Sequence, residues 1–250
     1  MCNSGAVARL TLLTWVTLLL LAAGRTLAAV DDPDALYRQR ADLARAREAL
    51  AIWDARLQTN PSDFESSWKV ARATYWIGPH EDRDAGRRTL ERGVTAGKRA
   101  SAIEPDRSEG YFWTAANMGA LAESYGLRQG LKYRGAIKDN LEHVLRIDPA
   151  YQKGSAYSAL GRWYHLVPAL FGGSEARSEE YLRKALTYNA DGILVHLYLA
   201  DTLFERDKDA EALEELSKTI AARRDPDFDP EEREMQAKAS AELARRSKPR

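Results

Sequence analysis

Three prolines at a constant spacing of 44 residues constrain what this chain can fold into. Pro61, Pro105 and Pro149 are each the last residue of a similar tripeptide, TNP, IEP and IDP. A related tripeptide, YNA, occupies residues 188–190. Proline cannot continue an α-helix, and it biases the residue before it away from helical geometry. Each tripeptide therefore predicts the end of a helix.

The residues that precede these tripeptides show helical periodicity. Apolar or small residues recur eight and four positions before the last residue of each tripeptide. Charged residues lie seven positions before it, on the other side of a helix. The residues eight positions before are Trp53, Gly97, Leu141 and Leu182. One amphipathic helix is thus predicted four times.

A second set of helices, richer in aromatic residues, is expected between these. It covers residues 64–77, 111–125, 152–166 and 193–204, separated from its partners by Gly and Pro at 78–79, 126–130 and 172–173. Ser174 is expected to cap the helix that follows it. A helix pair every 34–44 residues predicts an all-α fold, an α-solenoid of four to five TPR-like (tetratricopeptide) hairpins, in which stacked neighbours complete the core.

The first thirty residues differ from the rest. They contain no acid, and an uncharged run at 10–23 follows Arg9 and precedes the small residues of 26–28. This pattern predicts a secretory signal peptide over 1–29. The run is shorter than the roughly 17–25 residues of a membrane-spanning helix, so an uncleaved N-terminal anchor is the alternative.

The C-terminal segment predicts a capping helix. The repeat domain is expected to cover 31–228, and residues 229–250 a helix and a short tail. Asp229 is expected to cap this helix and Pro230 to take its first position, and acids in the first turn and arginines in the last suit the helix dipole. Its thin apolar stripe consists of Met235, Ala239 and Leu243.

Composition and spacing argue against catalysis, metal binding and nucleic-acid binding. Lys plus Arg and Asp plus Glu are 37 each, so the chain has no basic field for nucleic acid. The only cysteine is Cys2, and the four histidines lie 63, 22 and 31 residues apart, so no two of them have the spacing of metal ligands on one helix. The glycine-containing stretch 93–98 is one residue too short for a phosphate-binding loop and lies inside a predicted helix. We expect no catalytic residue, no metal and no cofactor.

Aromatic residues are the one positive signal for a binding site. Tyr111, Phe112 and Trp113 are consecutive and cannot share one helix face, and Trp163 and Tyr164 repeat the arrangement. Either these rings fill the core between helices, or a surplus face lines a concave groove for a peptide, a partner protein or an apolar ligand. On the second interpretation the candidate binding residues are Tyr111, Trp113, Asn117, Trp163, Tyr164 and Phe171.

Several stretches resemble one known family. They are EPDRSEGYFW at 104–113, IDPAY at 147–151, ALGRWY at 159–164 and FGGS at 171–174. They are similar to the TatT family, the tetratricopeptide-type accessory components of TRAP (tripartite ATP-independent periplasmic) transporters, over roughly residues 40–220. The resemblance implies a non-enzymatic periplasmic protein that associates with the transporter's periplasmic solute-binding protein and holds a small hydrophobic ligand. No lipidated cysteine follows the apolar run, so the lipid tether common in that family is not expected here.

Two functions remain open at this point. The first is the TRAP accessory role in the periplasm, or at the inner membrane if the N-terminus anchors the chain. The second is a general TPR scaffold for protein–protein interactions in the cell envelope. A homo-oligomer is compatible with both.

Overall fold

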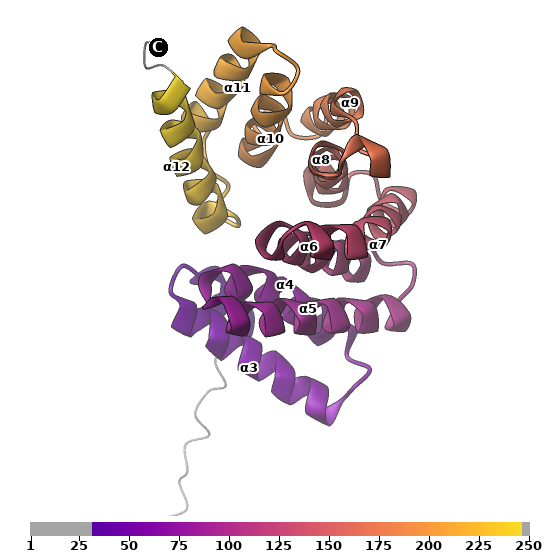
Figure 1. Ribbon diagram of the computed structural model, residues 1–250. Helices are drawn as coiled ribbons and strands as arrows, with labels where there is room; N and C mark the ends of the chain where they lie inside the picture. Colours follow the sequence, from indigo (N-terminus) through magenta and orange to yellow (C-terminus); the bar gives the residue numbers. More distant parts are fainter. Residues whose placement is uncertain (1–31, 247–250) are drawn as a thin grey trace, which may run out of the picture. The chain divides into compact units, whose positions relative to one another are not determined.

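The protein is all α-helical over the residues that the computed structural model describes, 32–246. Eleven α-helices and no strand lie in this range, and they form one compact unit from Pro33 onward (Figure 1). The signal peptide predicted over 1–29 lies outside the described residues. Among the helices of residues 32–246, none is long and apolar enough to cross a bilayer.

The helices follow one another as hairpins, as the repeat predicted, and the expected α-solenoid with a C-terminal capping helix is confirmed. Two helices, α2 (Pro33–Arg38) and α3 (Leu43–Thr59), come first. The hairpins are α4 (Phe64–Ile77) with α5 (Arg83–Ile103), α6 (Ser108–Tyr125) with α7 (Leu127–Ile147), α8 (Tyr151–Leu166) with α9 (Glu175–Leu186), and α10 (Ile193–Phe204) with α11 (Asp209–Ala221). The last helix is α12 (Asp229–Arg246).

The predicted helix ends are confirmed where proline sets them. Helices α3, α5 and α7 end two residues before Pro61, Pro105 and Pro149, and the residue after each helix is extended, with φ between −149° and −128°. Side chains cap the starts of α3, α4, α5 and α9, and at α9 Ser174 Oγ accepts from the amide of Arg177 at 3.3 Å. Local chemistry therefore fixes where the hairpins turn.

Three local expectations are wrong. The chain breaks only at Gly126, which has φ +84°, so α7 runs through Gly130 instead of beginning after it. Asp229 belongs to α12, and its carboxylate accepts from Arg224 and Arg233 instead of capping a backbone amide. Residues 152–154, expected to be helical, have left-handed backbone angles at the start of α8.

Helix α12 covers the end of the last hairpin. It packs against α10 and α11, with Ala239 fully buried and Met235 and Leu243 partly buried beside it. These are the three residues of the predicted stripe. Because the stripe is thin, the apolar contribution to holding α12 is small, and its polar contacts carry more weight.

Candidate binding site

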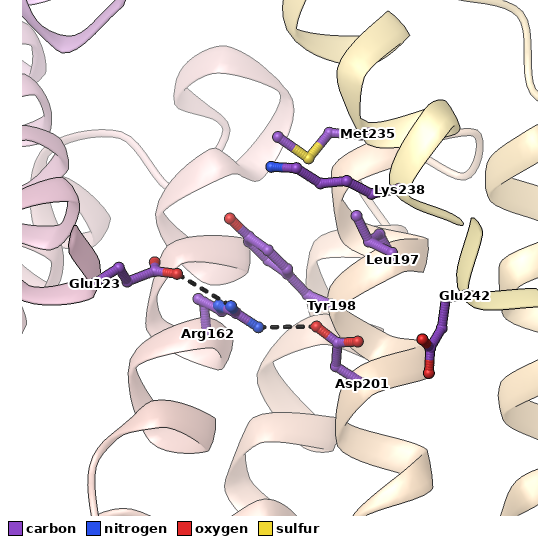
Figure 2. Close-up of a pocket in the computed structure, with 8 residues that line it drawn as sticks. All are labelled: Glu123, Arg162, Leu197, Tyr198, Asp201, Met235, Lys238 and Glu242. Carbon is purple, nitrogen blue, oxygen red and sulfur yellow. Dashed lines mark hydrogen bonds and ion pairs between the residues drawn. The ribbon is translucent and has the colours of Figure 1, made fainter. Parts of the chain in front are cut away.

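A cavity of about 330 Å³ lies where α12 meets the first helices of three hairpins, α6, α8 and α10. Figure 2 shows that Lys238 and Met235 reach toward Tyr198 from α12, opposite the side chains of the hairpin helices. We call it the Arg162 cavity. Its lining residues are Glu123, Arg162, Leu197, Tyr198, Asp201, Met235, Lys238 and Glu242.

Arg162 of α8 is clamped between two acids. Its Nη1 donates to Asp201 Oδ2 at 2.9 Å and its Nη2 to Glu123 Oε2 at 3.1 Å, and its guanidinium carbon lies 4.7 Å from the ring centroid of Tyr198. Its buried Nε has no hydrogen-bond partner in the described part of the chain. A buried guanidinium nitrogen without an acceptor is costly, so this atom is an unsatisfied donor beside the cavity.

The protonation of the lining is set by burial and by ion pairs. Burial raises the pKa of the Asp201 carboxyl, and the Arg162 ion pair opposes that rise without cancelling it. Burial likewise raises the pKa of the Tyr198 phenol, which stays a neutral hydroxyl. At the rim, hydrogen bonds from Arg245 and Arg246 lower the pKa of Glu242 to about 2. The cavity thus offers donors and acceptors of both signs beside the apolar Leu197.

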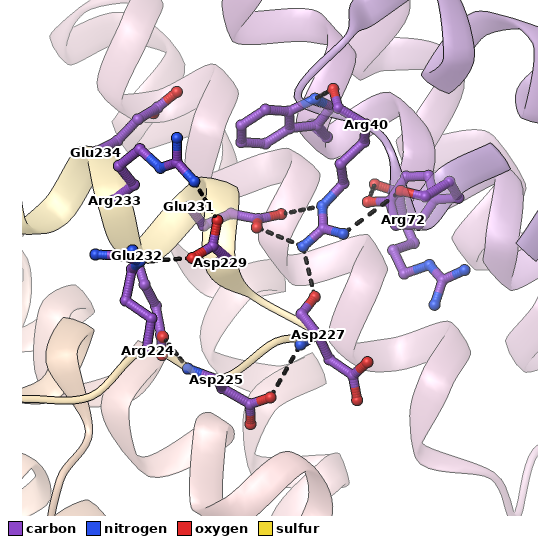
Figure 3. A network of polar contacts seen from close by, with 12 residues as sticks. Arg40, Arg72, Arg224, Asp225, Asp227, Asp229, Glu231, Glu232, Arg233 and Glu234 are labelled. Carbon is purple, nitrogen blue, oxygen red and sulfur yellow. Dashed lines mark hydrogen bonds and ion pairs between the residues drawn. The ribbon is translucent and has the colours of Figure 1, made fainter. Parts of the chain in front are cut away.

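A polar network joins α12 to the beginning of the unit. Arg40, only 3% exposed, donates from Nε and Nη2 to the two carboxylate oxygens of Glu231 at 2.7 and 2.5 Å, and from Nη2 to the carbonyl of Asp227 at 2.6 Å (Figure 3). Trp76 Nε1 donates to the carbonyl of Arg40 at 2.7 Å. Arg40, near the beginning of the described chain, is therefore held by residues near its end.

Two further contacts tie the same segment to other hairpins. His80 Nε2 lies 2.9 Å from Glu234 Oε1, and Lys153 Nζ lies 2.7 Å from Asp225 Oδ2. The left-handed turn at 152–154 places Lys153 in that contact. Residues 225–234 are thus bonded to the α2–α3 turn, to the turn after α4 and to the start of α8.

The aromatic residues singled out from the sequence lie mostly in the core. Trp113, Trp163, Tyr164 and Asn117 are buried, and none of them lines the Arg162 cavity. Asn117 Nδ2 donates to the carbonyls of Ala71 and Trp113, both at 2.8 Å, so its amide satisfies neighbouring backbone. For these four residues the structure corrects the groove interpretation, because helices on several sides cover them.

The other two predicted residues are more accessible but lie apart from the cavity. Tyr111 stacks on His143 with ring centroids 4.0 Å apart, and Phe171 stands 40% exposed after α8. Sequence reasoning missed Arg162, Tyr198 and Asp201. The available signal was a polar pair three residues apart, Tyr198 and Asp201, on a mostly apolar helix.

Comparisons with known proteins agree with this fold. Residues 30–170 match the family model described as RMD1-3, Regulator of microtubule dynamics protein 1-3. No curated protein matches the chain. Among solved structures, the thermophilic TPR protein TTC0263 of Thermus thermophilus has a TM-score of 0.64 at 23% identity, covering 86% of this chain and 100% of its own.

Two other solved structures show the same architecture. PilF of Pseudomonas aeruginosa has a TM-score of 0.55 at 15% identity, covering 86% of this chain and 91% of its own. A MamA fragment of Desulfovibrio magneticus RS-1 has a TM-score of 0.51 at 20% identity, covering 77% and 96% respectively. Together with the hairpins described above, these similarities show a TPR-like fold.

Proposed function

The chain belongs to the family of regulator of microtubule dynamics proteins 1–3, and from this we propose that it is a non-enzymatic TPR-type scaffold that binds a protein partner at the Arg162 cavity. The matched segment, residues 30–170, spans more than half of the 250-residue chain. TPR-like proteins as a class act in protein–protein interaction by presenting helical surfaces to peptides.

The observation that carries this proposal is the chemistry of the Arg162 cavity. A guanidinium with one unsatisfied nitrogen, a lysine, a neutral phenol, three acids and two apolar side chains converge there from four helices. Mixed polar and apolar linings of this kind suit a side chain or chain end of a partner protein, which brings both kinds of group. Such a lining favours a protein over the purely hydrophobic ligand implied by the TatT resemblance.

Three indications bear on which protein is bound and in which compartment. The family name describes regulation of microtubules, whereas the signal peptide expected over 1–29 favours export to the periplasm. An accessory role beside a TRAP solute-binding protein rests only on the resemblance over roughly residues 40–220, and the chain matches a different family model. We therefore carry over only the binding of a protein, which the TPR-like fold suggests, and we propose that this binding takes place in the cell envelope.

Site-specific photo-crosslinking in cells tests the proposal. A photoreactive amino acid replaces Lys238, which is exposed and lines the cavity, and in a matched control replaces Ser217, which is exposed on α11. A partner crosslinked from position 238 alone, and lost when Arg162→Gln is added, supports the proposal. Equal adducts from both positions, or none from 238, contradict it. A solute-binding protein among the crosslinked partners would establish the accessory role in a TRAP transporter.

A further inference from the structure

Exposed apolar side chains gather at the last residue of α8 and in the short loop that follows it. Four large apolar residues of the described chain are well exposed, and three of them are Leu166, Leu170 and Phe171, at 44%, 87% and 40%. Scattered exposed apolar residues are normal in soluble proteins, but a concentration of this kind marks an interaction surface. We call residues 166–171 the apolar loop.

The backbone holds the apolar loop away from the core. A 3₁₀ turn (Ala169–Phe171) follows the extended Pro168, and Gly172 leaves it in a left-handed conformation with φ +104°. The amide of Ser174 donates to the carbonyl of Tyr164 at 2.8 Å and closes the base of the loop. Leu170 is therefore presented to solvent by a defined turn.

The helix that contacts the apolar loop, α7, is basic over its first turns. The first twelve residues of α7, 127–138, contain four basic residues and no acid. The guanidinium carbon of Arg134 lies 5.4 Å from the ring centroid of Phe171, and Trp163 Nε1 donates to the carbonyl of Arg134 at 2.8 Å. The start of α7 is therefore packed beside the apolar loop.

Most of this charge is not neutralised within the described chain. Lys138 pairs with Glu142 at 3.3 Å, whereas Arg128, Lys132 and Arg134 form no ion pair with any residue of 32–246. The acid that begins α9, Glu175, contacts His165 at 2.8 Å. Three cations that no described acid neutralises thus accompany three exposed apolar side chains.

We propose that the apolar loop and the start of α7 form a docking site for an anionic phospholipid bilayer. Three side chains on a tight turn are too few for a stable protein interface, which covers about 800 Å² on each partner. They suit shallow insertion at the boundary between head groups and acyl chains, where unpaired Lys and Arg are attracted to anionic lipid. This inference uses different residues from the Arg162 cavity and stands independently of the proposed scaffold function.

A fluorophore at the loop tests this docking directly. In the full-length chain, Cys2→Ser removes the only cysteine and Ala169→Cys accepts an NBD label beside Leu170. Vesicles of phosphatidylglycerol and phosphatidylcholine should shift the label's emission to the blue, and pure phosphatidylcholine should not. A label at Ser217→Cys should not respond, even if residues 1–31 bring the chain to the vesicle.

Two variants in the labelled chain separate the apolar and ionic contributions. Leu170→Asp should abolish the blue shift. Arg128→Gln with Lys132→Gln and Arg134→Gln should weaken vesicle binding by about fivefold for each charge removed. Arg88→Gln with Lys98→Gln and Arg99→Gln removes the same charge from α5 and should not weaken it.

Three results would overturn the proposal. One is an unshifted label at position 169 in the presence of anionic vesicles, and another is a shift that survives Leu170→Asp. The third is a shift without vesicles that grows with protein concentration, which would assign the loop to contact between copies of the chain.

Discussion

Arg40 and Glu231, 191 residues apart in sequence, form a two-point ion pair in which the guanidinium donates to both carboxylate oxygens. Arg40 stacks within 5.0 Å of the Tyr37 ring centroid and 5.9 Å of that of Trp76, so its charge is shielded from water on several sides. A buried charge of this kind is tolerated only while its partner is present. The pair makes the position of α12 depend on the first turns of the unit.

Removing the carboxylate should therefore cost stability. Glu231→Gln leaves the Arg40 charge buried with only neutral acceptors, and we expect the free energy of unfolding to fall by about 3 kcal/mol. Chemical denaturation followed by circular dichroism measures this. Glu214→Gln, at an exposed position of α11, is the control and should change stability by under about 0.5 kcal/mol. Equal effects of the two substitutions would contradict the buried-pair interpretation.

His196 should make stability depend on pH. Its Nδ1 lies 2.5 Å from Glu215 Oε2 and its Nε2 lies 2.9 Å from the carbonyl oxygen of Ala190, so both ring nitrogens face acceptors and both need a proton. Burial of the ring opposes its charge, but the hydrogen bonds to Glu215 and Ala190 outweigh burial and raise the pKa of His196 above 6.5. Burial also disfavours the Glu215 carboxylate, yet bonds from His196 and Lys218 lower its pKa below 4.5.

The sign of the effect follows from these directions. The contribution of His196 is full below pH 6.5 and is lost as pH rises through its raised folded pKa, whereas that of Glu215 is present above pH 4.5 and is lost on acidification. Together they stabilise the fold most between these values. Thermal melts from pH 5 to 9 should show a decline above pH 6.5 that His196→Gln flattens. His143→Gln should keep the wild-type slope, and an unchanged slope in His196→Gln would refute the assignment.

Gly93 should be intolerant of alanine. A Cβ there would lie 2.1 Å from Asn117 Oδ1 and 2.2 Å from Thr74 Oγ1, which are bonded to each other across α4 and α6 at 3.2 Å. Gly93→Ala should therefore lower the free energy of unfolding by about 2 kcal/mol through overpacking. Gly135→Ala is the matched control, because nothing lies within 4 Å of its added Cβ. That change should stabilise α7 by about 0.5–1 kcal/mol.

The placement of Trp113 in the core has a direct test. Trp113→Ala should cost about 3–5 kcal/mol of folding free energy, because it opens a cavity between hairpins. Phe171→Ala, which truncates an exposed ring, should change the denaturation midpoint little. A Trp113→Ala variant with wild-type stability and impaired partner capture would restore the groove interpretation for this residue.

The helices could be predicted from the sequence because their signals are local. The prolines and the periodic apolar positions lie within one or two turns of the structure that they determine, as the ends of α3, α5 and α7 show. The contact of Arg40 with Glu231 is different, because it depends on the summed rotation of all the hairpins between them. No spacing in the sequence encodes that sum.

The aromatic run misled for a related reason. Consecutive rings on α6 cannot share a face, but α6 contacts α4, α5, α7 and α8, so several of its faces are interior. Trp113 packs against Tyr75 with ring centroids 5.7 Å apart, while Phe112 packs against Tyr151 at 5.4 Å. A helix in the middle of a stack buries several of its faces, and the number of its neighbours could not be read from one helix alone.

The bond between Arg40 and Glu231 also bears on how this protein comes apart. Linear repeat arrays commonly fray from their terminal units, because those have a neighbour on one side only. Here the turn between α2 and α3 and the start of α12 are bonded to each other, so melting one of them removes the partner of the other. Amide hydrogens in these two segments should then exchange with solvent through the same opening event. The repeat array would thus unfold as one cooperative unit, as a globular domain does.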